Sequence, residues 1–145
     1  ALREIVHHKG AAAIVPVDDE EYVYLVRQHR VVNDMLTWEI PAGKLDTADE
    51  DPLHCAVREL REETGAIAES WTPLGSLIAS PGCYDEVLYL YLAQDLHYGA
   101  TDPDEDEFLA VERMPLDQLA RLCLEGEVTD AKTVCAVLKA KLLGL

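Results

Sequence analysis

Two apolar segments near the start of the chain predict the first strands of a sheet. Residues 11–17 and 21–28 are rich in Val, Ile and Tyr, and they flank a short polar stretch at residues 18–20. β-Branched and aromatic residues favour strands, and a short polar stretch between two such segments favours a turn. We therefore predict that these two segments pair as a β-hairpin.

The rest of the chain alternates between strand-like and helix-like patterns. A helix is predicted over residues 51–64, because Pro52 suits a first helical turn and Gly65 suits a helix stop. The other predicted elements are strands at 37–40, 72–80, 86–93 and 108–114, an acidic loop at 95–106, and helices at 116–124 and 129–143. This alternation predicts one α/β domain over residues 1–145, with a mixed sheet covered by helices.

The charge of the chain excludes some classes of partner. With 28 acidic and 12 basic residues, the formal net charge is -16. Such a surface repels nucleic-acid phosphates, so we expect no DNA or RNA partner. The longest apolar runs, such as residues 11–17, are far too short to span a membrane. An anionic ligand would need cations in its site, and metal ions held by carboxylates would supply them.

The cysteines and the first residues predict a reducing compartment. Cys55, Cys83, Cys123 and Cys135 show no Cys-x-x-Cys spacing, so we expect small, mostly buried thiols rather than a zinc site. The start of the chain lacks the basic-then-apolar pattern of a signal peptide. We therefore expect a cytoplasmic protein.

The predicted helix at 51–64 carries clustered carboxylates. Residues three and four apart share a helix face, so Glu59, Glu62 and Glu63 lie together beside the apolar stripe of the same helix. Like charges at this spacing repel, which suggests a compensating divalent cation with oxygen ligands. Taken alone, an acidic helix is more often a solvated surface helix, so the surrounding residues have to decide.

Those residues form a pattern that resembles a known signature, the Nudix box. The matching positions are Gly43, Glu50, Arg58, Glu59, Leu60, Glu62, Glu63 and Gly65. There are two departures: Asp49 rather than Glu50 stands at the strict first acidic position, and Ala66 replaces a larger aliphatic residue. Further segments look like the ADP-ribose pyrophosphatase branch of that family, namely Val26-Arg27-Gln28-His29-Arg30, residues 38–44, Ser80-Pro81-Gly82 and Thr129-Asp130-Ala131-Lys132-Thr133.

The resemblance implies a fold and a metal centre. The fold would be a Nudix-type α/β/α sandwich with a mixed β-sheet, and the cofactor two or three Mg²⁺ ions, with Mn²⁺ as the alternative. The implied metal ligands are Glu59, Glu62, Glu63 and the backbone carbonyl of Ala42, with Glu50 a weaker candidate. Arg58 would orient the glutamates. Glu62 and Arg58 thus count among the expected catalytic residues.

Residues outside the helix complete the expected site. The family uses a loop glutamate as base or extra ligand, and Glu105 and Glu107 in the acidic stretch 102–107 are the candidates. Arg30 or Arg27 would bind phosphate, because a guanidinium matches phosphate oxygens in a bidentate way, and Arg30 is the better match of the two. Glu39 would accept hydrogen bonds from a ribose or adenine. Each of these residues also has a plain alternative, a solvated loop or a surface side chain.

Two positions bear on the substrate. Pro81 lies sixteen residues after Gly65, a spacing that marks ADP-ribose hydrolases, whereas Tyr84 lies eighteen residues after Ala66, a position linked to the dinucleoside polyphosphate branch. We expect a small-molecule nucleotide substrate, with ADP-ribose and water giving AMP and ribose 5-phosphate. The alternatives are another diphosphate (a dinucleoside polyphosphate, nucleotide sugar or oxidised nucleotide) or a sensor that binds ADP-ribose or an NAD-type ligand without cleaving it. The resemblance also implies a homodimer.

Overall fold

Two sheets form the centre of the molecule in the computed structural model, which describes residues 2–98 and 111–144. The four-stranded sheet has the order β4 (Ala42–Lys44), β1 (Ala11–Pro16), β6 (Val87–Tyr98) and β5 (Ala66–Ile78). Strands β1 and β6 are parallel and the other pairs antiparallel, so this sheet is mixed as predicted. The three-stranded antiparallel sheet has the order β3 (Met35–Glu39), β2 (Tyr22–Arg30) and β7 (Val111–Pro115).

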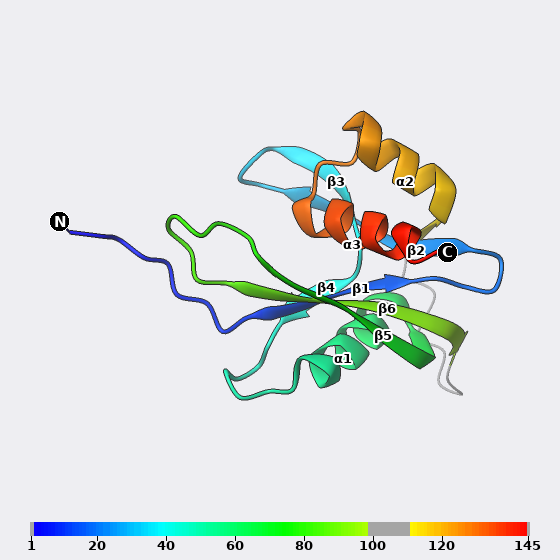
Figure 1. Ribbon diagram of the computed structural model, residues 1–145, viewed down its shortest axis with the longest axis horizontal. Helices are drawn as coiled ribbons and strands as arrows, with labels where there is room; N and C mark the ends of the chain where they lie inside the picture. The colour runs from blue at the N-terminus through cyan, green and yellow to red at the C-terminus, as the bar shows by residue number, and fades with distance from the viewer. Residues whose placement is uncertain (1, 99–110, 145) are drawn as a thin grey trace.

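Helices cover both faces of the four-stranded sheet (Figure 1). Helix α1 (Pro52–Thr64) lies on one face and α3 (Ala131–Leu142) on the other, and α2 (Leu116–Glu125) packs against α3 and against β7 and β2 of the second sheet. Alternate residues of a strand point to opposite faces. On β1, Ile14 accordingly packs in the cluster that contains Leu60 of α1, and Val15 packs in the cluster that contains Val137 of α3. This layering is the predicted α/β/α sandwich.

The predicted hairpin of residues 11–17 and 21–28 is wrong. Strand β1 pairs with β4 and β6, strand β2 pairs with β3 and β7, and only an isolated bridge joins Val17 to Val23. Every residue of β1 is buried, as in a central strand with covered faces. Such a strand takes partners on both sides, and those partners come from distant parts of the sequence.

Several predicted boundaries also shift. Strand β5 starts at Ala66 and not at residue 72, because residues 66–72 pair with β6, which itself continues to Tyr98 through the start of the predicted acidic loop. Residues 99–106 of that loop and 108–110 of the predicted strand lie outside the described residues. Helix α1 agrees well with its prediction: Asp51 caps it, Pro52 begins it, and Gly65 ends it at φ 72°.

The cysteines are free throughout. Cys55 and Cys123 are buried, but Cys83 is exposed and Cys135 lies between, so burial is less general than predicted. Among residues 2–98 and 111–144, no helix has the length and apolar character needed to cross a membrane.

Candidate active site

A cleft of about 480 Å³ gathers residues from six parts of the chain. Strand β4 supplies one wall, with Glu63 of α1 beside it, and Arg30 of β2 and the first residues of α3 supply another. The segment before β1 and the loop between β5 and β6 complete the rim. The lining residues used below are His8, Arg30, Ala42, Gly43, Glu63, Tyr84, Asp130 and Lys132. The cleft therefore brings Glu63 of the acidic helix together with three basic residues, Arg30, Lys44 and Lys132.

Two of the three clustered glutamates face strand β4. Oε2 of Glu63 accepts a 3.1 Å hydrogen bond from the backbone N–H of Ala42. The Glu59 carboxylate lies against Gly43 so closely that a Cβ on this glycine would come within 1.9 Å of its Cδ. The Glu62 side chain, by contrast, is 59% exposed. The structure thus places Glu63 in the lining of the cleft and Glu59 against Gly43, another lining residue, and leaves the Glu62 side chain exposed.

The pKa values of Glu59 and Glu63 are both raised. Burial raises the pKa of Glu63 to about 7, and the nearby charge of Glu59 acts in the same direction. Burial also raises the pKa of Glu59, although the adjacent Arg58 guanidinium opposes that shift. Two partly desolvated carboxylates that repel each other are stabilised when a cation binds between them.

Arg58 holds Glu59 from behind. Its Nη1 donates a 2.6 Å hydrogen bond to Oε1 of Glu59 and a 3.4 Å bond to Glu62, four residues further along the helix. Its Nη2 donates to the carbonyl of Lys44 and lies 3.6 Å from Oε1 of Glu50. Asp46 also lies 3.7 Å from this nitrogen, whereas Asp49 is exposed, so of the two candidates for the first acidic position Glu50 is the one that contacts Arg58.

Side chains supply only part of the ligand set that a hard divalent cation needs. Within the described residues, no three His, Cys, Asp or Glu side chains lie close enough together to hold an ion. Glu59 and Glu63 nevertheless offer oxygen donors at a place where burial penalises their charge. Mg²⁺ commonly takes one or two carboxylates and completes its octahedron with water, backbone or phosphate oxygens. The residues present therefore fit such an ion.

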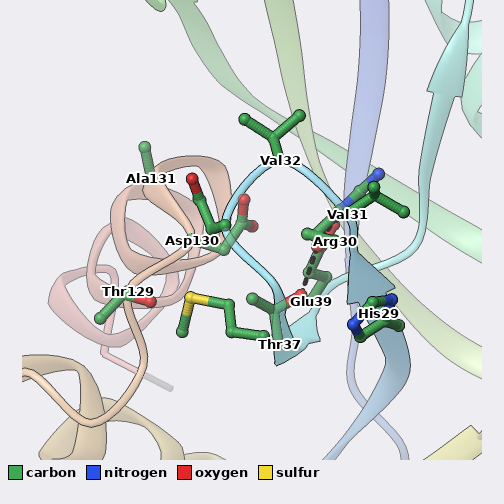
Figure 2. A pocket seen from close by; sticks show the side chains of 11 residues that line it. His29, Arg30, Val31, Val32, Thr37, Glu39, Thr129, Asp130 and Ala131 are labelled. Carbon is green, nitrogen blue, oxygen red and sulfur yellow. Dashed lines mark hydrogen bonds and ion pairs between the residues drawn. The ribbon is translucent and has the colours of Figure 1, made fainter.

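Glu39 does not face the cleft as a free acceptor. Its side chain is 2% exposed, and Figure 2 shows it bonded to Arg30. Arg30 donates twice, at 2.6 and 2.5 Å, Thr37 donates at 2.6 Å and Lys132 at 2.7 Å. Burial alone would raise the pKa of Glu39, but these bonds lower it to about 2. A carboxylate has about four acceptor sites, so none remains for a ribose or adenine.

Arg30 and Arg27 point to different places. Arg30 is 46% exposed and donates two of its N–H groups to Glu39. It lines the cleft of about 480 Å³, called the main cleft below because it contains Glu63, and also the neighbouring pocket of about 550 Å³ drawn in Figure 2. Arg27 lies over the Trp38 ring, 5.6 Å from its centroid, and contacts Glu112 at 3.4 Å. It lines a separate pocket with Trp38. Only Arg30 joins Glu63 at the main cleft.

The remaining predicted residues lie at the edge or beyond. Pro81 is exposed in the turn in which Tyr84 N–H donates to the Ser80 carbonyl, and this turn brings Tyr84 to the cleft. Glu105 and Glu107 lie outside the described residues. Lys132 and His8 also line the cleft, and no sequence pattern predicts a role for either. Asp130 does carry a local signal, since it has the form of a helix N-cap three residues before Thr133.

Comparisons with known proteins agree with this architecture. The sequence model described as NUDIX domain matches residues 7–137. Over 137 residues the chain is 41% identical to an ADP-ribose pyrophosphatase of Bacillus subtilis (strain 168), covering 93% of this chain and 74% of that protein. It is 42% identical to a methanol dehydrogenase activator of Bacillus methanolicus, again over 93% and 74% of the two chains.

A solved structure shows the same fold. The crystal structure of an ADP compounds hydrolase superposes with a TM-score of 0.78 at 28% identity, covering 92% of this chain and 71% of that one. The acidic helix and the cleft beside it thus lie within the segment, residues 7–137, that matches the NUDIX domain model. The protein belongs to the Nudix family of hydrolases.

Proposed function

We propose that the protein hydrolyses ADP-ribose to AMP and ribose 5-phosphate. The observation that carries this proposal is the main cleft, whose lining includes Glu63, Arg30 and Lys132, with the Glu59 carboxylate against the lining residue Gly43. A diphosphate placed there would meet a cation-binding edge and a guanidinium together. The names of the Bacillus subtilis relative and of the structural neighbour support the adenosine diphosphate class of substrate.

In this proposal the glutamates hold Mg²⁺, with Mn²⁺ as the alternative. Glu59 and Glu63 are the principal ligands, with the Ala42 carbonyl and Glu62 as the further predicted ones. When bound, such ions neutralise the phosphoryl oxygens and lower the pKa of a bound water. Arg58 fixes the Glu59 carboxylate through its 2.6 Å hydrogen bond, and Arg30 offers its remaining donors to the diphosphate.

The proton acceptor is proposed to come from the acidic stretch 102–107. Glu105 and Glu107 are the candidates, and both belong to a segment that follows β6 in sequence. A carboxylate within hydrogen-bond reach of the attacking water would act as general base. Replacing each in turn by Gln distinguishes them, because loss of the base lowers kcat and leaves KM nearly unchanged.

A second candidate substrate class has one observation in its favour. Tyr84 lines the main cleft, with its ring 5.5 Å from that of His8 in an edge contact. Aromatic rings offer a stacking surface to a second base, as a dinucleoside polyphosphate would require. A role as a sensor that binds ADP-ribose without cleaving it is the remaining alternative.

A substrate panel with product analysis tests the proposal. Purified protein with Mg²⁺ is given ADP-ribose, diadenosine polyphosphates, FAD, nucleotide sugars and dNTPs, with an EDTA-treated sample as control. Release of AMP chiefly from ADP-ribose is expected. Preferred cleavage of diadenosine polyphosphates would assign the second class. Tight binding of ADP-ribose with no product, in a folded and metal-loaded sample, would assign the sensor role.

We also propose a homodimer in a reducing compartment. The free state of all four cysteines is compatible with such a compartment. Sedimentation or light scattering gives the mass in solution, and a monomer at micromolar concentration would contradict the dimer.

A further inference from the structure

The start of helix α3 carries a compact group of polar contacts, here called the α3 clamp and formed by Asp130, Lys132 and Thr133. Asp130 caps the helix by accepting from the Thr133 N–H at 3.1 Å and from Thr133 Oγ1 at 2.6 Å. Nζ of Lys132 lies 3.0 Å from both oxygens of Asp130. These bonds are local and stabilise the helix end.

Two further bonds leave the helix and reach the end of β3. Lys132 donates a 2.7 Å bond to Oε2 of Glu39, and the backbone N–H of Ile40 donates a 2.9 Å bond to Oγ1 of Thr133. Thr133 is fully buried, Ile40 is 1% exposed and Glu39 2%. Helix capping does not require either bond. They join parts of the chain that are 93 residues apart in sequence.

The Thr133 hydroxyl is used in a defined direction. Its single proton goes to Asp130, so its oxygen lone pairs are left for the Ile40 N–H. A buried backbone N–H without an acceptor is costly. The position of the Ile40 peptide is thereby fixed relative to α3.

The clamped residues lead directly into the active site. After Ile40, the Pro41 carbonyl accepts from Ile14 N–H, the Ala42 N–H donates to Glu63, and Gly43 lies against the Glu59 carboxylate. On the other side, Glu39 holds Arg30 with two short bonds. The clamp is therefore connected to both proposed parts of the site. Ile40 precedes the Ala42–Gly43 segment that contacts Glu63 and Glu59, and Glu39 bonds directly to Arg30.

We propose that the α3 clamp positions both sides of the active site: Thr133 holds the segment that leads to Ala42 and Gly43, and Lys132 holds Arg30 through Glu39. This rests on the proposed function for the identity of the substrate. The clamp is not itself proposed to bind the anion, because Nζ of Lys132 is already bonded to the carboxylates of Glu39 and Asp130. Lys132 and Thr133 are thus positioning residues, acting through side chains or peptides that would contact metal or substrate.

Three variants separate the two arms from a general effect on the helix. Thr133→Val keeps the volume and removes the acceptor for Ile40, while Thr133→Ser keeps the hydroxyl. Lys132→Met removes the bond to Glu39. Lys139→Met is the matched control, because Lys139 is another α3 lysine whose Nζ bonds to a backbone carbonyl, that of Leu74, at 2.8 Å. Thermal melts and circular dichroism report on folding.

The readouts differ for the two arms. Thr133→Val is expected to weaken Mn²⁺ binding about tenfold by calorimetry without substrate, and to lower kcat by a similar factor, from one unpaired buried donor. Thr133→Ser is expected to stay within about threefold of wild type on the same scale. Lys132→Met is expected to raise KM for ADP-ribose about tenfold with Mn²⁺ affinity unchanged, the loss of one charged hydrogen bond. Lys139→Met is expected to leave all three quantities unchanged.

The contrary results are equally specific. The clamp is refuted if Thr133→Val and Lys132→Met match Lys139→Met in Mn²⁺ affinity, kcat and KM. It is also refuted if Thr133→Val, Thr133→Ser and Lys132→Met all lose activity in parallel with a fall in melting temperature. If Thr133→Val does not fold, the change in KM of Lys132→Met decides. A wild-type protein that fails to cleave ADP-ribose would refute the proposed function alone, because the Mn²⁺ comparison of Thr133→Val with Thr133→Ser needs no substrate.

Discussion

The carboxylate of Glu59 occupies the space beside Gly43 that a side chain would fill. A Cβ at Gly43 would lie 1.9 Å from Cδ of Glu59 and 2.0 and 2.3 Å from its two oxygens. The clashing atoms are the far end of a flexible side chain, and no backbone atom is among them. A methyl group at Gly43 is therefore expected to displace this carboxylate.

Gly43→Ala should therefore separate function from stability. We expect Mn²⁺ affinity and kcat to fall by at least about tenfold, since displaced ligand positions typically cost 10–100-fold. The melting temperature should change little. Gly82→Ala is the control, because a Cβ at Gly82 meets no atom within 4 Å. Calorimetric Mn²⁺ titration and a melt of each variant check the prediction, and equal Mn²⁺ affinity in both variants would contradict it.

Local signals explain which parts of the structure were predictable. Helix α1 was predicted closely because Asp51, Pro52 and Gly65 are start and stop signals within the segment itself. The face shared by Glu59 and Glu63 follows from helical spacing, and in the structure Glu63 lines the cleft while Glu59 lies against Gly43.

Long-range pairing explains what was missed. The hairpin of β1 and β2 failed because the partners of β1 are β4 and β6, and no local pattern specifies them. Nothing near Glu39 in the sequence indicates that Lys132 reaches its carboxylate, so this bond is not predictable from the local pattern. The turn of Glu62 to the outer side depends on how α1 sits against β4, which the helical pattern leaves open.

Glu63→Gln should abolish most activity in a folded protein. Glu63 is half-buried, and Gln keeps the acceptor for the Ala42 N–H while removing the charge that would bind the metal. We expect kcat to fall by more than about a hundredfold, beyond the effect of a residue that only supports a ligand. Glu69→Gln, at a 71% exposed side chain on β5, is the control. Near-normal turnover in folded Glu63→Gln would remove Glu63 from the metal site.

Glu39→Gln should destabilise the protein in a pH-dependent way. The pKa of Glu39 is lowered to about 2 in the fold by its bonds to Arg30, Lys132 and Thr37, against an ordinary value of 4.5. Its ionised form therefore adds stability above pH 4.5, and this contribution is lost as the pH falls through 2. We expect Glu39→Gln to lower the free energy of unfolding by about 2 kcal/mol at pH 7. This is less than the cost of breaking a fully buried ion pair, because Arg30 remains partly solvated.

Urea unfolding at several pH values measures this effect. The difference in unfolding free energy between wild type and Glu39→Gln should be constant from pH 7 to 5 and shrink steadily between pH 4.5 and 2. A difference that stays the same at pH 3 would mean that the Glu39 carboxylate is not the group that stabilises the end of β3.

Metal-free protein should become less stable as the pH rises, because of Glu63. Its folded pKa of about 7 exceeds the ordinary 4.5, so the folded state binds more protons between these values. This contribution to stability is complete below pH 4.5 and is lost as the pH rises through 7. In EDTA the melting temperature of wild type should therefore fall more steeply from pH 5 to 8 than that of Glu63→Gln.

Added Mg²⁺ should reverse this trend only where Glu63 is ionised. Metal ligands must be deprotonated, so protons compete with the ion below pH 7 and the affinity falls by up to about tenfold per pH unit for one proton released. We expect Mg²⁺ to raise the melting temperature of wild type clearly at pH 8 and much less at pH 5. In Glu63→Gln we expect no rise at either pH. An equal rise at both pH values, or one that survives in Glu63→Gln, would mean that the ion stabilises the protein from another place, and the pairing of Glu59 with Glu63 would then have no role in binding it.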